Sequence, residues 1–166
     1  HDMIGLADTR PAALRLARRY ASPAAVEGAW KATRRHWESF LAPLDVRTPD
    51  PGFDVLTNVW LKYQAMSGRI WGRTGYFQPG GAYGYRDQLQ DSQVFLPSRP
   101  EHTRKQILLH AAHQFEDGTT YHWWHPLTEE GVRKPYNDDL LWLPFVTLNY
   151  LRETADFGLL EEPVSY

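Results

Sequence analysis

The stretch FDVLTNVWLKYQAMSGRIW, residues 53–71, carries the clearest structural signal in the chain. Its apolar side chains recur mainly at spacings of three and four residues, the period of one face of an α-helix. These side chains are Val55, Leu56, Val59, Trp60, Tyr63 and Met66. The turn cluster TPDPG at 48–52 precedes the stretch, and glycine-rich sequence follows it. We therefore predict one long helix from Phe53 to about Trp71.

Further helices on both sides of this one indicate the fold class. Prolines near helix starts predict helices at 11–20 and from 23 to about 41, and the sequence pattern predicts others at 86–95 and 100–115. A last helix is expected between about 139 and 154. Because Pro144 lies inside it, that helix either begins near Leu143 or kinks there. The alternation of helices and irregular loops indicates an all-α fold.

Two intervening segments are predicted as loops. Residues 72–85 hold five of the twelve glycines and Pro79, so an irregular loop must follow the long helix. Residues 119–135 form a second loop, with a short extended piece at 120–124. Functional residues tend to lie on loops of this kind.

Composition narrows the class of protein. The chain has 166 residues, 42% of them hydrophobic, which is enough for one domain with a buried core. A net charge of −2 gives no polybasic face for a phosphate backbone, so nucleic acid is not an expected partner. No apolar run approaches membrane-spanning length, and we expect no membrane contact by this segment. The sequence has no cysteine, which removes thiolate chemistry. A cytoplasmic location is favoured but not decided.

Two segments combine carboxylates, amides and aromatic rings, a mixture that suits a carbohydrate site. They are GGAYGYRDQLQD at 80–91 and YNDDLLW at 136–142. Asp138 and Asp139 precede the last helix, so one interpretation makes one of them a cap and the other a favourable charge. The other interpretation makes one of them a general acid, kept protonated by nearby aromatic rings.

The acids at 87 and 91 allow the same two interpretations. They are either a cap with exposed charge pairs, or Asp87 accepts hydrogen bonds from two adjacent sugar hydroxyls beside the glycine loop. Arg69, Arg73 and Arg86 are candidates for an anionic ligand.

Other chemistries find little support. The histidine pairs at 110 and 113 and at 122 and 125 have helical metal spacing, but no matching third ligand accompanies them, so we expect no metal. The glycines lack the phosphate-loop pattern, and no serine lies in a nucleophile elbow.

Five motifs resemble one known family in their order and spacing. They are GRIWGR at 68–73, GGAYGYRDQLQD at 80–91, QILLHAAHQF at 106–115, HWWHP at 122–126 and DDLLWLP at 138–144. Together they resemble glycoside hydrolase family 94, the inverting glycoside phosphorylases. The family includes cellobiose and chitobiose phosphorylases and the phosphorylase-like domain of cyclic β-1,2-glucan synthases.

This resemblance implies an (α/α)6 barrel in which inorganic phosphate attacks the anomeric carbon and one carboxylic acid protonates the leaving sugar. Asp138 matches the general acid, with Asp139 as the runner-up. Asp87 matches the acid that binds hydroxyls of the cleaved sugar, and Arg73 matches an arginine of the same subsite. The expected substrate-binding set also includes Arg86, Gln88, Tyr136, Trp124 and His122. No metal or organic cofactor is implied, and phosphate is the co-substrate.

One departure from the family pattern bears on the substrate. Where cellobiose-type members have a second arginine shortly before the Arg-Asp pair, this chain has Gly80 and Gly81. That difference favours the branch acting on β-1,2-glucans, and phosphorolysis of β-linked gluco-oligosaccharides is the expected activity. The alternatives are an inverting glycosidase or transglycosylase on the same barrel, or a noncatalytic carbohydrate-binding or helical interaction module.

Length indicates that the chain is part of a larger domain. Six helix pairs need roughly twice this many residues. We expect residues 1–50 to be helices leading into the barrel and residues 51–166 to be a partial catalytic domain. The expected partners are an oligosaccharide, the remainder of the catalytic domain and, as an option, a second copy. The isolated chain should be inactive and should self-associate through the stripe at 55–60 and a second stripe at Ile107, Leu108 and Ala111.

Overall fold

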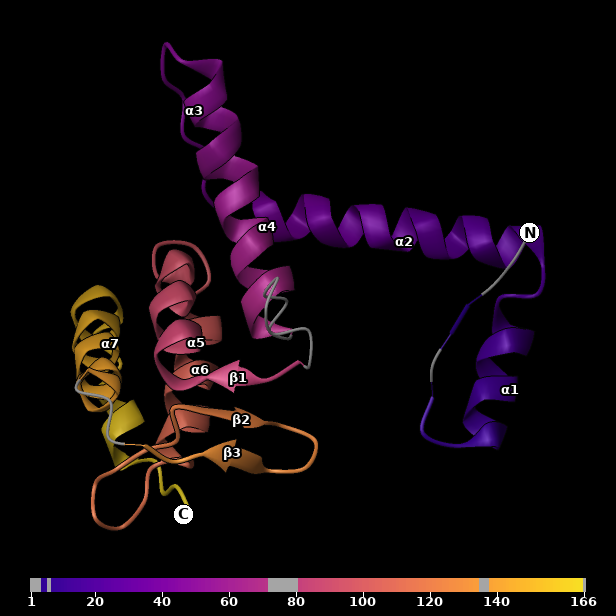
Figure 1. Cartoon of the computed structure of the whole chain (residues 1–166). Coiled ribbons are helices and arrows are strands. Elements are labelled where there is room, and N and C mark those ends of the chain that lie inside the picture. Colours follow the sequence, from indigo (N-terminus) through magenta and orange to yellow (C-terminus); the bar gives the residue numbers. More distant parts are fainter. Residues whose placement is uncertain (1–3, 6, 72–80, 135–137, 166) are drawn as a thin grey trace. The chain divides into compact units, whose positions relative to one another are not determined.

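The computed structural model describes residues 4–5, 7–71, 81–134 and 138–165 (Figure 1). It divides into two compact units, His1–Ala42 and Pro43–Tyr166. Within the described residues, no helix combines the length and the apolar character needed to cross a membrane.

The first unit consists of the two predicted helices, α1 (Arg10–Arg19) and α2 (Pro23–Leu41). Each begins with a hydroxyl cap and a proline. The side chain of Thr9 accepts a hydrogen bond from the Ala12 amide, and Ser22 accepts one from Ala25. A capped start satisfies amides that lack a partner inside the helix. Both helix predictions are therefore confirmed.

The second unit begins with the predicted long helix. It runs from Pro51 to Ile70 through α3 (Pro51–Val55), the π-helical turn η1 (Leu56–Trp60), α4 (Leu61–Ala65) and the π-helical turn η2 (Met66–Ile70). The Asp50 side chain caps its start by accepting from the amides of Gly52 and Phe53. The two π turns were not predicted, because one extra residue in a turn barely changes the apolar spacing. Such turns are frequent at functional sites.

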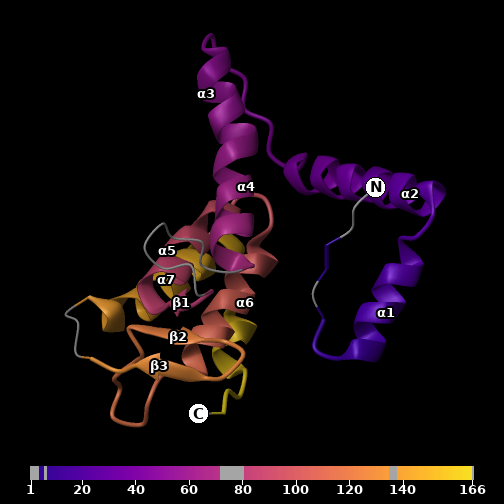
Figure 2. The same ribbon diagram turned by 45° about the vertical axis from the view of Figure 1, so that its right-hand side comes forward.

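Three helices enclose the core of this unit. They are α5 (Tyr85–Ser92), α6 (Pro100–Ala111) and α7 (Asp139–Thr154), which lie side by side in Figures 1 and 2. The 3-10 turns η3 (Gln93–Phe95) and η4 (Phe157–Glu161) follow α5 and α7. The buried cluster consists of Tyr85, Leu89, Ile107, Trp124, Val146, Tyr150 and Leu159.

A small antiparallel sheet lies at one end of these helices. Its order is β1 (Tyr83–Gly84), β2 (Trp123–His125) and β3 (Glu130–Val132). Trp124 pairs with Tyr83 on one side and with Gly131 on the other. Gly131 must be glycine, because a Cβ there would lie 2.5 Å from the Trp123 carbonyl oxygen. The sheet fixes the segments that precede α5 and α7.

The fold confirms the all-α class, since helices form most of the described chain, but several details differ from the predictions. β1 lies where we predicted only loop, and α6 ends at Ala111, four residues early. α7 spans Asp139–Thr154 as predicted, with Pro144 inside it, which excludes the alternative of a start near Leu143. Burial of Val146 and Tyr150 on the same helix offsets the local cost of the proline.

Candidate active site

The starts of α5 and α7 meet through an ion pair. Nη1 of Arg86, in the first turn of α5, lies 2.6 Å from Oδ2 of Asp138, immediately before α7. The guanidinium also lies over the ring of Trp142, whose Nε1 donates to the same Asp138 oxygen at 3.4 Å. The Asp138 side chain remains 48% exposed. Its carboxyl group is therefore both held in place and accessible to a ligand.

Asp139, the next residue, has a different environment. It is only 2% exposed, and its Oδ2 lies 2.8 Å from Nδ1 of His122. Burial raises the pKa of Asp139, which His122 opposes, and the nearby carboxylates of Asp138 and Asp87 raise it further. Within the described residues, its Oδ1 makes no hydrogen bond. A raised pKa suits an acid, but this carboxyl group is closed off from the surface.

His122 is fixed by its backbone. Its amide donates to the Val132 carbonyl at 2.8 Å, and its own carbonyl accepts from the Tyr85 amide at 3.1 Å. The sheet thus carries His122 to the first turn of α7, where it contacts Asp139. The position of Asp139, and with it the start of α7, is tied to the sheet.

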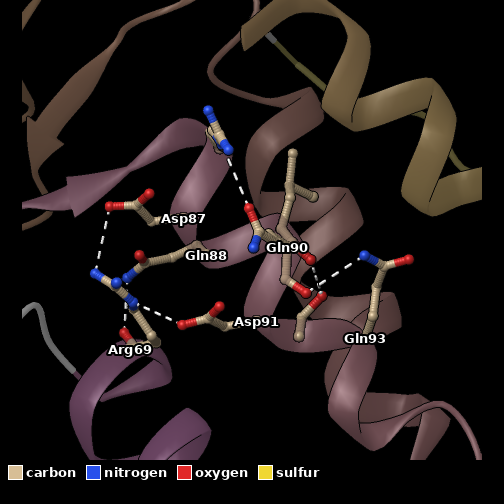
Figure 3. A network of polar contacts seen from close by, with 9 residues as sticks. Arg69, Asp87, Gln88, Gln90, Asp91 and Gln93 are labelled. Carbon is tan, nitrogen blue, oxygen red and sulfur yellow. Dashed lines mark hydrogen bonds and ion pairs between the residues drawn. The ribbon is translucent and has the colours of Figure 1, made fainter. Parts of the chain in front are cut away.

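Asp87 belongs to a second group of charges on α5. Its Oδ2 lies 3.3 Å from Nη1 of Arg69, and Nε of the same arginine lies 2.7 Å from Oδ2 of Asp91 (Figure 3). Gln88 is completely buried and donates from Nε2 to the Arg69 carbonyl at 2.7 Å. Arg86, the residue before Asp87, pairs with Asp138, so Asp87 lies in the turn of α5 that meets the start of α7.

This arrangement presents an accessible carboxyl group at one helix start and a second carboxylate at the next, with arginines beside both. Carboxylates that accept from sugar hydroxyls and a carboxylic acid that donates to a glycosidic oxygen are what such a site needs. Within the described residues, no group of three or more His, Cys, Asp or Glu side chains is placed to hold a metal ion.

Comparison with known proteins identifies the family. Residues 36–166 match the glycosyl hydrolase 94 superfamily, catalytic domain. The chain belongs to this superfamily. The match confirms the resemblance drawn from the five motifs and, with the helical structure, the assignment to part of an (α/α)6 barrel.

Individual members of the glycosyl hydrolase 94 superfamily match most of the chain. It is 42% identical over 138 residues to the cyclic beta-(1,2)-glucan synthase NdvB of Rhizobium meliloti (strain 1021), covering 83% of this chain and 5% of the synthase. It is 27% identical over 180 residues to the N,N'-diacetylchitobiose phosphorylase of Vibrio furnissii, covering 92% of this chain and 22% of that enzyme. It is 28% identical over 170 residues to the solabiose phosphorylase of Paenibacillus borealis, covering 100% of this chain and 20% of the relative. The chain thus spans a fifth or less of the synthase and the solabiose phosphorylase, and little more of the chitobiose enzyme.

Two of the residues assigned to this glycosyl hydrolase 94 site are buried instead. Trp124 is 0% exposed, stacked on His113 at 4.2 Å between ring centroids and packed edge-on against Tyr83 and His110. Trp124 therefore packs in the core of this unit, and its expected role as a sugar-binding residue stays a prediction. Gln88 is equally buried and donates to the Arg69 carbonyl, and its expected contact with substrate likewise stays a prediction.

The histidine pair at 110 and 113 also serves packing. His110 is buried against Tyr85 and Trp124, and desolvation lowers the pKa of its imidazole to about 3. Its Nδ1 lies 2.7 Å from the Gln106 carbonyl. His113 lies between the Leu109 carbonyl and Glu129. Two further assignments, Arg73 and Tyr136, lie outside the described residues.

Sequence reasoning missed how Arg69 and Asp91 take part. Arg69 was assigned to an anionic ligand, whereas the structure places it between two carboxylates. The spacing of Asp87 and Asp91 was the available signal, because residues four apart on a helix share a face and two acids there favour a nearby cation. Neither acid serves as the N-cap of α5, which is Gly84, and the Asp138 side chain makes no capping bond to α7.

A separate cavity of about 640 Å³ lies beside the β2–β3 hairpin. Phe115, Tyr121, Glu129 and Arg133 are among its lining residues. None of the carboxylates at the starts of α5 and α7 contributes to it, so the cavity is distinct from the candidate site.

Proposed function

We propose that this chain contributes the acid and one sugar subsite to a catalytic domain that performs inverting phosphorolysis of β-linked gluco-oligosaccharides. The observation that carries the proposal is the exposed carboxyl group of Asp138, held by Arg86, the residue that precedes Asp87 on α5. Inorganic phosphate is the co-substrate, and the reaction uses no metal and no organic cofactor.

In this reaction Asp138 donates its proton to the glycosidic oxygen that leaves. A phosphate oxygen attacks the anomeric carbon from the opposite face, so the carbon–oxygen bond to the leaving sugar breaks as the new one forms. The products are an inverted sugar 1-phosphate and a shortened sugar. Asp138 is left as a carboxylate, which Nη1 of Arg86 stabilises from 2.6 Å, and recovers its proton from solvent. Phosphate replaces the activated water of an inverting hydrolase, so one protein carboxyl group suffices.

Asp139 has a structural role in this reaction. Its buried bond to His122 fixes the first turn of α7, and that turn carries Asp138. Asp138 is the better acid because it is accessible, whereas the raised pKa of Asp139 belongs to a group without access to substrate. Asp139 remains the second candidate for the acid.

The substrate class rests on the similarity to the cyclic beta-(1,2)-glucan synthase, the relative quoted above with the highest identity. We propose a β-1,2-linked glucan or oligosaccharide as the substrate. The departure at Gly80 and Gly81 from cellobiose-type members supports the same choice.

The remainder of a catalytic domain is the proposed partner. The helical run Pro51–Ile70 exposes a large apolar face that a barrel would bury: Phe53, Val55, Leu56, Val59, Trp60 and Leu61 are each at least 38% exposed. We propose that the catalytic part starts near residue 51, with residues 1–50 leading into it; the second compact unit begins eight residues earlier, at Pro43. The expected second stripe at Ile107 does not exist, because Ile107 is buried in the core.

Product analysis of the complete enzyme that carries this segment tests the proposal. Incubation with β-1,2-linked gluco-oligosaccharides and phosphate should release α-glucose 1-phosphate in proportion to oligosaccharide consumed, and none without phosphate. Reducing sugar formed at the same rate without phosphate would instead establish a glycosidase or transglycosylase. Binding without turnover would establish a noncatalytic module. The 166-residue chain alone should release no sugar phosphate and should form concentration-dependent oligomers.

A further inference from the structure

Arg69 joins two carboxylates that the sequence places on the same face of α5. Asp87 and Asp91 are four residues apart, so their side chains are neighbours and their like charges repel. Arg69 contacts both, through Nη1 at 3.3 Å and Nε at 2.7 Å (Figure 3). All three side chains are roughly one-third exposed, so solvent only partly screens the pairs. We call Arg69, Asp87, Gln88 and Asp91 the α5 clamp.

The backbone of Arg69 is held as firmly as its side chain. Arg69 lies near the end of the π-helical turn η2, where carbonyl groups lack partners within the helix. The buried Gln88 amide donates to the Arg69 carbonyl at 2.7 Å, and the Tyr83 hydroxyl donates to the Ile70 carbonyl at 3.0 Å. Residues on either side of Asp87 thus anchor the turn from which Arg69 reaches back to Asp87.

The clamp leaves the Asp87 carboxylate a defined place. A Cβ at Gly84, the N-cap of α5, would lie 3.0 Å from its Oδ2, so glycine provides the space on that side. Arg69 contacts that same oxygen from the α5 face. Arg69 on one side and the open space at Gly84 on the other thus both contribute to the position of the carboxylate.

We propose that Arg69 is a positioning residue that sets the orientation of Asp87 toward the sugar. The inference rests on the proposed function in taking Asp87 as the acid that binds sugar hydroxyls. Arg69 acts through Asp87. Asp91 is its second carboxylate partner and holds the guanidinium in place beside Asp87. Loss of the guanidinium leaves two adjacent carboxylates that repel one another, which turns Asp87 away from its place.

Steady-state kinetics of the complete enzyme test this role. Arg69→Met should raise KM for the oligosaccharide about tenfold and lower kcat/KM about a hundredfold, with KM for phosphate unchanged. Arg69→Lys keeps the positive charge but loses the planar guanidinium that contacts two carboxylates at once. Its kcat/KM should therefore be about tenfold higher than that of Arg69→Met. Asp91→Asn keeps Arg69 and should change kcat/KM less than fivefold. Arg104→Met is the matched control, because Arg104 also bridges two carboxylates elsewhere in the unit.

A double-mutant cycle between Arg69 and Asp87 distinguishes a positioning role of Arg69 from a general structural role. Arg69→Met added to Asp87→Asn should cause no further loss beyond that of Asp87→Asn alone. Equal losses from Arg69→Met in both backgrounds, or a parallel rise in KM for phosphate, would overturn the proposal. If Arg69→Met fails to fold, Arg69→Lys in the two backgrounds gives the same decision. Oligosaccharide affinity by calorimetry reports this coupling even if no sugar phosphate forms, so failure of the proposed function and failure of this inference remain distinguishable.

Discussion

Two arginines of the same compact unit each bridge a pair of carboxylates, in different settings. Arg69 holds Asp87 and Asp91, both on α5, the helix whose first turn also carries Arg86, the partner of Asp138. Arg104, on α6, contacts Glu162 and lies 3.2 Å from Asp156, two acids that flank η4 in the C-terminal segment. Asp156 also accepts from the Tyr150 hydroxyl at 2.7 Å. The Arg69 bridge includes Asp87, a residue of the candidate site, whereas the Arg104 bridge attaches the segment after α7 to α6.

The contrast shows why an arginine with two acids is not by itself a functional signal. Hydrogen bonds from Tyr150 and Arg104 lower the pKa of Asp156, as expected of a structural carboxylate. The neighbours distinguish the Arg69 bridge: an accessible Asp138 paired with Arg86, and a buried Asp139 with a raised pKa. Variants at the α5 clamp and its neighbours should therefore lose activity first, and variants at the Arg104 bridge should lose stability first.

The largest expected effect is at Asp138. Asp138→Asn keeps the size of the side chain and removes the proton donor, so kcat of the complete enzyme should fall about a thousandfold, within the range for general acid catalysis. Asp156→Asn, its counterpart at the Arg104 bridge, should leave kcat within about twofold. Asp139→Asn should cost about tenfold through loss of the His122 contact. A severe loss in Asp139→Asn with near-normal turnover in Asp138→Asn would assign the acid to Asp139.

The next largest effect is at Asp87. Asp87→Ala should lower kcat/KM about a hundredfold, or about 3 kcal/mol, because charged hydrogen bonds to sugar hydroxyls strengthen as the ring distorts. Arg104→Met should leave kcat/KM unchanged while lowering the melting temperature by a few °C, on the scale of about one lost surface ion pair. Initial rates and thermal melts of both variants provide the comparison. Unchanged oligosaccharide kinetics in Asp87→Ala would show that Asp87 does not bind the sugar and only forms an ion pair with Arg69.

A smaller, pH-dependent effect should mark the Arg104 bridge. The folded-state pKa of Asp156 lies below its ordinary value of 3.8, so its contribution to stability is complete above that value and is lost as the pH falls through the lower folded-state pKa. Melting temperatures of the 166-residue chain between pH 2 and 6 should therefore fall less steeply at the acid end in Asp156→Asn than in the wild type. Identical slopes in the two proteins would show that Tyr150 and Arg104 do not stabilise the ionised carboxylate.

Much of the fold could be predicted because helix periodicity is local. The helices at 10–19, 23–41 and 51–70 follow from apolar spacing, capping residues and proline positions. Pro144 left the start of α7 open between two alternatives, because the local cost of the proline is outweighed by burial that depends on other helices. The strand at 83–84 forms only because residue 124, far along the chain, supplies its partner.

The site was predictable in its composition and less so in its contacts. The motifs located Asp87 and Asp138, but nothing local shows that Trp124 is enclosed by rings from α5 and α6 or that Arg69 reaches two acids. The sequence places a tryptophan between histidines, a pattern that suits a sugar platform and a core equally well. Burial decides between them, and burial depends on residues distant in sequence.

The central claim, that Asp138 donates the proton to the leaving sugar, is tested most directly by changing the leaving group. Turnover by Asp138→Asn should be measured with a β-linked gluco-oligosaccharide and with 2,4-dinitrophenyl β-glucoside, whose leaving group needs no proton. The loss relative to wild type should be about a thousandfold with the oligosaccharide and less than tenfold with the dinitrophenyl donor. An equal loss with both donors would contradict the assignment, because it would show that Asp138 does not act as the general acid.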